Sequence, residues 1–266
     1  MAESVIMNAY HFTNNTVISF SGGRSSAYLL YKTLEAHDFK LPENIKVIFC
    51  NTGKEMPQTL DFVEDCAYNW NVPIVWLEYN GKRTYKEVDY ETASRNGEPF
   101  EKLIIDRSYL PNSMARFCTS ELKVLTIERY MNCEFDTAVG IRGDEPRRVV
   151  KMRAKDGYHV PLADDNVTEV DISMFWQEQK FDLQLPKAEF NTLSNCDLCF
   201  LKGTKIKKSI IEHKPELADW WIAQEERLNA RFRKDSPSYK DLQIIAKEQS
   251  NLFDFDDSTM SCFCGD

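Results

Sequence analysis

A short apolar run that leads into a glycine-containing turn constrains this 266-residue chain more than any other feature. The pattern predicts a buried strand over residues 17–20, a turn over 21–26 and a helix that begins before residues 27–31. A helix start leaves backbone N–H groups unpaired and carries partial positive charge, and two adjacent glycines let an anion approach the backbone closely. The segment therefore predicts a phosphate-binding loop at the end of a strand.

The polar residues of this segment are the candidates for holding a nucleotide. They are Ser19, Ser21, Gly22, Gly23, Arg24, Ser25 and Ser26. The segment contains neither a Gly-x-x-x-x-Gly-Lys loop nor a Gly-x-Gly-x-x-Gly fingerprint, so it would be a different kind of phosphate cradle. The alternative is an ordinary serine- and glycine-containing turn that caps a helix.

Strand-like and helix-like segments alternate through the first half of the chain. Apolar runs predict strands over residues 45–50, 73–77 and 137–141, and helical periodicity covers residues 57–70. Such alternation predicts an α/β fold with a doubly wound, Rossmann-like parallel sheet, whose ligands bind at the carboxyl ends of the strands. Residues 81–111 are polar and mixed, and we expect an insertion or a mobile substrate loop there.

The C-terminal part of the sequence carries helical patterns and few strand signals. Helices are predicted over residues 169–176, 205–213, 215–233 and 239–247. We therefore expect a nucleotide-binding α/β domain over residues 1–158 and a helical C-terminal region with a cysteine cluster over residues 159–266.

Two more polar segments follow predicted strands and supply further binding candidates. They are Asn51, Thr52 and Gly53 after the second strand, and Gly140, Arg142, Glu145 and Arg148 after the fourth. Arginine can pair bidentately with phosphate or sulfate oxygens, so Arg142 and Arg148 are candidates for the anionic end of a substrate. A surface cluster of salt bridges is the alternative for the second segment.

The composition is that of an ordinary globular protein, since 42% of the residues are hydrophobic and the chain is long enough to bury a full core. No apolar stretch approaches the ~20 residues that span a bilayer, and the first residues lack a signal-peptide pattern, so we expect a cytoplasmic protein without a membrane partner. The net charge of −9 opposes loose binding of nucleic acid. Local basic clusters, such as residues 147–153, leave a nucleic-acid partner open.

Eight cysteines in a reducing compartment favour metal binding or sulfur chemistry over a disulfide framework. Cys50, Cys66 and Cys133 lie in apolar or helix-like surroundings, and we expect them to be buried as small hydrophobic residues. The other five are Cys118, Cys196, Cys199, Cys262 and Cys264. A Cys-x-x-Cys turn directs two thiolates at one metal, and further ligands from elsewhere complete a zinc site or an iron–sulfur cluster. Free thiols are the alternative.

Three segments, in order along the chain, resemble motifs of the phosphoadenosine phosphosulfate reductase family in the PP-loop adenine nucleotide alpha hydrolase-like superfamily. Residues 21–26 resemble its Ser-Gly-Gly-x-Asp-Ser PP-loop, residues 51–59 its Asn/Asp-Thr-Gly-x-x-x-Pro-Glu-Thr segment, and residues 140–148 its Gly-x-Arg-x-x-Glu-x-x-Arg stretch. Ser25 stands where the PP-loop has Asp, so no role of that carboxylate carries over. The resemblance implies binding of ATP or a related adenine nucleotide, with Mg²⁺.

The cysteine pattern resembles that of the iron–sulfur branch of this family. The resemblance implies a [4Fe–4S] cluster held by Cys118, Cys196, Cys199 and Cys262, with Cys264 as the alternative fourth ligand and zinc as the alternative metal. Sulfonucleotide reductases carry a catalytic cysteine in a Glu-Cys-Gly-x-His tail, and Cys264 is the candidate for that nucleophile here. This chain lacks the Glu before and the His after it.

The resemblance implies three functions that the sequence leaves open. The first is adenylylation of a substrate by ATP with pyrophosphate release, followed by sulfur transfer. The second is reduction of an adenylyl-sulfate substrate to sulfite, and the third is a non-catalytic subunit that senses nucleotide or redox state. The partners that follow are a thioredoxin-like reductant or sulfur donor, a nucleic-acid sulfur acceptor, and a second copy of the chain in a homodimer.

Overall fold

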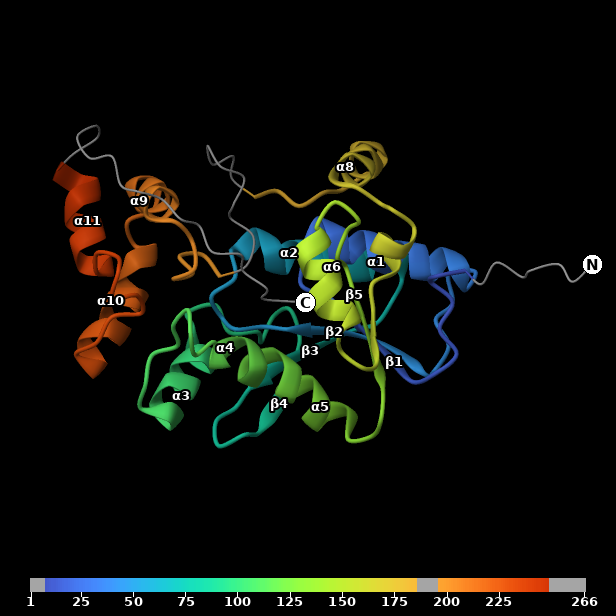
Figure 1. Cartoon of the computed structure of the whole chain (residues 1–266), viewed down its shortest axis with the longest axis horizontal. Coiled ribbons are helices and arrows are strands. Elements are labelled where there is room, and N and C mark those ends of the chain that lie inside the picture. The colour runs from blue at the N-terminus through green and yellow to red at the C-terminus, as the bar shows by residue number, and fades with distance from the viewer. Residues whose placement is uncertain (1–7, 186–195, 249–266) are drawn as a thin grey trace, which may run out of the picture.

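The computed structural model describes residues 8–185 and 196–248. Within these residues one sheet has the strand order β4-β3-β2-β1-β5-β6, and Figure 1 shows helices on both of its faces. The strands are β1 (Thr16–Ser19), β2 (Ile45–Cys50), β3 (Ile74–Tyr79), β4 (Tyr85–Val88), β5 (Asp136–Val139) and β6 (Tyr158–His159). β4 pairs antiparallel with β3, and the other pairings are parallel.

The helices alternate with these strands and then continue alone to the end of the described chain. The first six elements are α1 (Arg24–Ala36), α2 (Pro57–Trp70), α3 (Glu98–Arg107), α4 (Phe117–Thr119), the π-helix η1 (Ser120–Val124) and α5 (Leu125–Met131). The others are α6 (Pro146–Arg153), α7 (Pro161–Asp164), α8 (Glu169–Glu178), α9 (Thr204–His213), α10 (Leu217–Leu228) and α11 (Tyr239–Glu248). No helix in the described ranges has the length and apolar character that crossing a membrane requires.

The central strand β1 is buried on both faces of the sheet. Val17 packs in a cluster with Ile127 of α5, whereas its neighbour Ile18 packs in a cluster with Leu30 of α1. Successive side chains of a strand point to opposite faces, so an uninterrupted apolar run suits a strand that is covered on both sides. A ligand can therefore reach β1 most easily at the ends of the sheet.

The order of the strands reverses at β1. The chain first moves outward from β1 to β2 and β3, and it later returns to the other side of β1 as β5. β1 and β5 are therefore neighbours, and the strands that follow them, β2 and β6, lie on opposite sides of this pair. Open α/β sheets bind their ligands at such a point.

The α/β fold expected from the sequence is confirmed, and so are most of its elements. The predicted strand over residues 45–50 and the predicted helix over residues 57–70 coincide with β2 and α2. The predicted helix over residues 215–233 is too long, because α10 ends at Leu228 and the next residue, Asn229, adopts the left-handed conformation with φ 45°. Residues 229–233 fit the helical pattern of the sequence, but the helix ends before them.

The region over residues 81–111 corrects the expectation of a mobile substrate loop. It contains β4, which pairs with β3, and α3, whose Phe100 and Leu103 are buried. The sequence pattern concealed these elements because β4 is an edge strand with half-exposed polar residues. The segment is an integral part of the sheet and of a core cluster.

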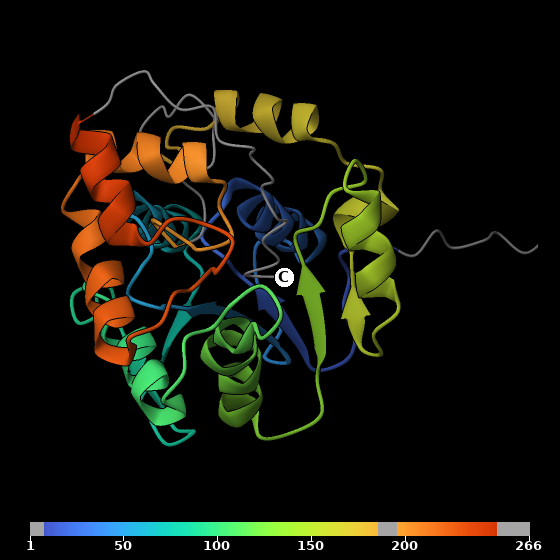
Figure 2. The same ribbon diagram turned by 60° about the vertical axis from the view of Figure 1, so that its left-hand side comes forward.

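The last three described helices form a layer of their own. Figures 1 and 2 show α9, α10 and α11 gathered at one end of the molecule, where α3 also lies. Trp221 of α10 and Leu242 of α11 share one hydrophobic cluster with Phe100 of α3 and Leu122 of η1. The helical C-terminal region therefore packs directly on elements that precede β5.

Candidate functional site

The loop after β1 has the tight geometry that its glycines predict. Gly22 has φ +74°, and a Cβ atom there would lie 2.6 Å from Cγ2 of Thr59, so only glycine fits without strain. Gly23 caps α1 in an extended conformation. The Ser26 hydroxyl accepts hydrogen bonds from the backbone N–H groups of Ser21, at 3.2 Å, and Gly23, at 3.3 Å. These two hydrogen bonds to the Ser26 hydroxyl hold the backbone of the loop in its tight conformation.

The loop after β5 lies directly against this turn. A Cβ atom on Gly140 would lie 2.8 Å from both the N and the Cα atoms of Ser26, so the backbones approach as closely as glycine allows. Beyond this contact, Nη1 of Arg142 donates a hydrogen bond of 3.4 Å to the Ser25 hydroxyl. The structure thus brings two of the three predicted binding segments together at the carboxyl ends of β1 and β5.

Both arginines that the sequence assigned to an anionic substrate are paired with carboxylates. Arg142 Nε donates to Asp144 at 2.8 Å and its Nη2 lies 3.6 Å from Glu169, while Arg148 donates to Glu145 at 2.6 Å. Burial alone would raise the pKa of Asp144, but the backbone N–H of Glu169 and the Arg142 guanidinium hold that pKa below its ordinary value. A bound phosphate or sulfate would have to take the place of these carboxylates as a partner of arginine.

Arg24, at the first position of α1, is held by the chain that follows α8. Its guanidinium pairs with Asp182, with Nε 2.7 Å from Oδ1. Trp176 of α8 donates from Nε1 to the backbone carbonyl of Arg24 at 3.2 Å. Sequence reasoning missed Asp182 and Trp176, because each lies more than 150 residues from the loop it supports and no local pattern connects them.

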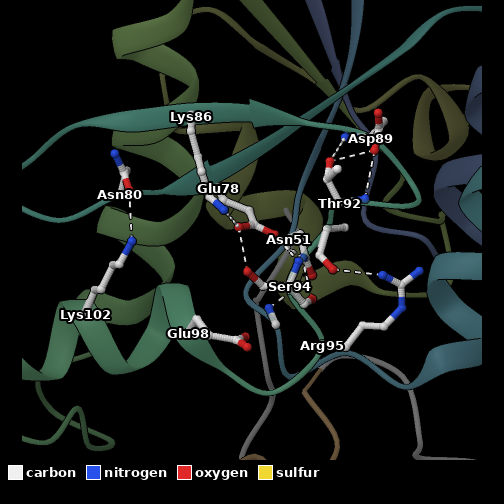
Figure 3. A network of polar contacts seen from close by, with 12 residues as sticks. Asn51, Glu78, Asn80, Lys86, Asp89, Thr92, Ser94, Arg95, Glu98 and Lys102 are labelled. Atoms are coloured by element: carbon white, nitrogen blue, oxygen red, sulfur yellow. Dashed lines mark hydrogen bonds and ion pairs between the residues drawn. The ribbon is translucent and has the colours of Figure 1, made fainter.

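Asn51, at the end of β2, lies inside a network of polar contacts that Figure 3 shows. The Asn51 side chain is completely buried, and its Nδ2 donates to Glu78 at 2.6 Å and to the Ser94 carbonyl at 2.8 Å. Its Oδ1 accepts from the Gly53 N–H at 3.0 Å. Glu78 also accepts from the Ser94 N–H and hydroxyl and pairs with Lys86 at 2.9 Å. The Asn51 side chain therefore fixes the loop from within, and Glu78 and Ser94 are supports that sequence reasoning missed.

The next residue of the loop lies beside the cysteine pair. The Thr52 hydroxyl donates to the Glu55 carboxylate at 2.8 Å, and the same carboxylate accepts from the Thr52 N–H at 3.0 Å. The Thr52 hydroxyl oxygen also lies 3.7 Å from Sγ of Cys196. The segment after β2 therefore lies beside the pair of Cys196 and Cys199.

Three of the predicted metal ligands belong to one apolar cluster. Cys118, Cys196 and Cys199 are each less than 10% exposed and share the cluster that includes Trp221. Within residues 8–185 and 196–248, no group of three or more His, Cys, Asp or Glu residues is arranged to hold a metal ion. The predicted fourth ligand, Cys262, and the predicted nucleophile, Cys264, lie outside the described residues. The described part alone therefore does not form the predicted four-cysteine site.

Of the three cysteines that were expected to be buried, the structure buries two. Cys50 and Cys66 are buried as expected, and burial raises the pKa of the Cys50 thiol to about 12. Cys133 is exposed instead of buried. The reason is that α5 ends at Met131 and Asn132 turns the chain with φ 46°, so Cys133 falls in a surface loop.

A groove of about 820 Å³ lies among β1, η1, α5 and β5. Its lining includes Ser19, Thr119, Cys133 and Asp156. Ser19, which the sequence assigned to nucleotide binding, thus lines a space large enough for a small substrate. The groove starts next to the loop after β1.

Comparisons with known proteins agree with this arrangement. The model of the phosphoadenosine phosphosulfate reductase domain matches residues 15–156, which include the loops after β1, β2 and β5. An uncharacterized nin region protein, ORF290, of Escherichia phage lambda is 31% identical over 204 residues, which are 71% of this chain and 67% of that protein. An uncharacterized protein of Methanocaldococcus jannaschii is 32% identical over 115 residues, 36% of this chain and 23% of that protein. With more than half of its length inside the domain match, the chain belongs to the phosphoadenosine phosphosulfate reductase family.

Proposed function

We propose that the chain binds ATP at the carboxyl ends of β1 and β5 and uses it to adenylylate a substrate, with release of pyrophosphate. The observation that carries this proposal is the close approach of Gly140 to Ser26. It places the Arg142 guanidinium within hydrogen-bond distance of the Ser25 hydroxyl in the first turn of α1. A helix start offers unpaired N–H groups and partial positive charge. Arg142 adds a guanidinium at the same point.

Each part of this site has a task in the proposed reaction. A substrate oxygen attacks the α-phosphorus of ATP, the bond between that phosphorus and the bridging oxygen breaks, and pyrophosphate leaves with the bridging oxygen. The amides of the loop and the first turn of α1 would hold the departing phosphates, and Arg142 would exchange Asp144 for a phosphate oxygen as negative charge develops. Mg²⁺ would accompany ATP, and we assign no protein ligands to it.

The test of this reaction is the product that ATP yields. Incubation of the protein with ATP should give pyrophosphate, together with AMP when water takes the place of the substrate oxygen as the attacking group, instead of ADP and phosphate; ³¹P NMR detects the products. Arg142→Ala should reduce the rate about 100-fold, the size of effect expected when one charge-stabilising donor is removed. Formation of ADP, or an unchanged rate in Arg142→Ala, would contradict the proposed role of the site.

For the sulfur step we propose a [4Fe–4S] cluster on Cys118, Cys196, Cys199 and Cys262, with zinc as the alternative. The burial of the first three in one cluster supports the proposal, although they do not form a complete ligand set by themselves. Such a cluster would supply sulfur and redox chemistry next to Thr52. After adenylylation, a sulfide-level sulfur from the sulfur donor would attack the activated carbon, so that a C–S bond forms as the C–O bond breaks and AMP leaves with the substrate oxygen.

Anaerobic purification followed by metal analysis tests the cluster. Iron and sulfide in equal amounts, with broad visible absorbance that Cys196→Ala abolishes, would agree with the proposal. A colourless protein with one zinc ion, or with no metal, would contradict it.

A second candidate function is reduction of an adenylyl-sulfate substrate to sulfite, which the domain match favours by its description. In this reaction a cysteine thiolate attacks the sulfate sulfur, the nucleotide leaves, and a thioredoxin-like dithiol releases sulfite. Sulfite formation that is lost in Cys264→Ala would support this reaction over adenylylation.

A third candidate, a non-catalytic sensor, follows from Ser25 in place of the PP-loop Asp and predicts ATP binding without turnover.

The acidic lining of the groove disfavours a nucleic acid as a sulfur acceptor that binds there. Glu128, Glu134, Asp136 and Asp156 line it, and their carboxylates would repel a phosphate backbone. If a nucleic acid is the acceptor, it should approach from another side. The thioredoxin-like partner and the homodimer stay predictions.

A further inference from the structure

We propose that Lys54 and Asp197 are positioning residues that couple the loop after β2 to the loop of Cys196 and Cys199. In this view, ATP at the loop after β1, where Gly22 packs against Thr59 of α2, also stabilises the cysteine loop, which it does not touch. The inference rests on the proposed nucleotide binding, and it adds a physical connection between the nucleotide site and the loop of Cys196 and Cys199.

The first observation is a buried ion pair between the two loops. Nζ of Lys54 lies 2.8 Å from Oδ2 of Asp197, and the two side chains are 6% and 3% exposed. Trp221 donates from Nε1 to the other carboxylate oxygen of Asp197 at 2.8 Å, and the Lys54 ammonium lies 5.2 Å from the ring centroid of Trp220. Two charges can be buried only when their geometry is well satisfied, so this pair fixes one relative position of the two loops.

The backbones of the two loops are joined as well. The Asp197 N–H donates to the Lys54 carbonyl at 2.7 Å, and Glu55 and Cys196 form an antiparallel bridge. The Thr52 hydroxyl lies 3.7 Å from Sγ of Cys196. A displacement of Thr52 is therefore transmitted to Cys196 through direct contacts.

Close packing leaves the loop after β2 no room to move independently. A Cβ atom on Gly53 would lie 2.9 Å from the Gly97 nitrogen, and one on Gly97 would lie 2.5 Å from Nε1 of Trp220. On the far side, Lys202 donates from Nζ to the Cys196 carbonyl at 2.6 Å. Densely packed groups of this kind shift together and not one at a time.

The experiment is hydrogen–deuterium exchange of the full chain, purified anaerobically, with and without ATP, read by mass spectrometry. In the wild type, ATP should slow exchange in the loop over residues 20–27. It should also slow exchange over residues 196–203 by about fivefold or more, the lower end of typical coupling between sites. This readout does not depend on turnover or on a loaded metal.

The decisive variant is Lys54→Met/Asp197→Asn, which removes both charges and leaves no unpaired buried ion. ATP should still slow residues 20–27, but residues 196–203 should no longer respond. Lys208→Met, which breaks the Lys208–Glu212 pair on α9, is the control and should behave like the wild type. If the double variant does not fold, Asp197→Asn alone, which keeps an acceptor for Trp221, takes its place.

The outcomes separate the two proposals. If ATP slows neither segment of the wild type, nucleotide binding itself fails and the coupling falls with it. If ATP slows residues 20–27 but not residues 196–203, the binding stands and the coupling is overturned. A response of residues 196–203 that persists in the charge-free variant also overturns the role of Lys54 and Asp197.

Discussion

At the scale of single residues, the two glycines of the loop after β1 differ in whether the structure has room for a larger side chain in their place. Gly22 has φ +74° and faces Thr59, whereas a Cβ atom on Gly23 would meet only the Ser21 hydroxyl at an ordinary 3.6 Å. We predict that Gly22→Ala lowers the free energy of unfolding by about 1–3 kcal/mol, the usual cost of a side chain in this backbone region. Gly23→Ala should change it by less than about 0.5 kcal/mol. Urea denaturation of both variants checks this, and equal losses would show that the turn is not as described.

Glu121 in η1 gives the structure a pH dependence. It is 3% exposed, pairs with Arg107, and accepts from Arg129 at 2.9 Å. Burial alone would raise its pKa, but the two arginines outweigh burial and hold the pKa below the ordinary value. Its contribution to stability is therefore complete above the ordinary pKa of a glutamate and is lost as the pH falls through the lowered folded-state pKa.

We predict that Glu121→Gln destabilises the fold at neutral pH by about 1–2 kcal/mol, less than for a fully buried pair because Arg107 is partly exposed. The difference in unfolding free energy from the wild type should shrink as the pH is lowered below about 4, where the wild-type carboxyl group also loses its charge in the unfolded state. Urea unfolding at a series of pH values measures it. A difference that is constant from pH 7 to pH 3 would exclude this role for the charge of Glu121.

At the scale of elements, the loop after β5 is expected to recognise phosphates and not the nucleoside. Arg142→Ala should raise the Kd for ATP about 10- to 100-fold, which corresponds to the ~1.4–2.7 kcal/mol of one charge-assisted contact, and should leave the Kd for adenosine unchanged. Arg153→Ala, which removes an exposed pair between Arg153 of α6 and Asp164 of α7, is the matched control. Equal weakening of ATP and adenosine would indicate that the loop had lost its shape instead of a phosphate contact.

The sequence predicted elements well where one short segment carries the whole signal. The apolar run of β2 and the periodicity of α2 are local, and so are the glycines and arginines that follow β1 and β5. The supports of the site are not local, because Glu78 lies 27 residues from Asn51 and Asp197 contacts Lys54 only through the folded chain. β4 escaped prediction because a half-exposed edge strand has no apolar pattern.

At the scale of the whole molecule, the C-terminal helices complete a core that begins in the α/β part. Phe100, Leu103 and Leu122 are almost fully buried in the cluster that contains Trp221 of α10. We predict that the full chain unfolds in a single calorimetric transition. A chain truncated after residue 185 should bind a hydrophobic dye and lose cooperative unfolding, since each exposed apolar side chain costs about 1.5–3 kcal/mol. Two separate transitions would instead indicate that the C-terminal helices unfold independently of the α/β part.

The nucleotide site is tested most directly by calorimetric titration of the anaerobically purified chain with ATP, alongside Gly140→Ala. A Cβ atom at that position would lie 2.8 Å from the backbone of Ser26, so it must push the loop after β5 away from the first turn of α1. We predict one ATP site per chain, with an affinity at least about tenfold weaker in the variant, which corresponds to ~1.4 kcal/mol. No binding by the wild type, or equal affinity in Gly140→Ala, would contradict a nucleotide site between β1 and β5.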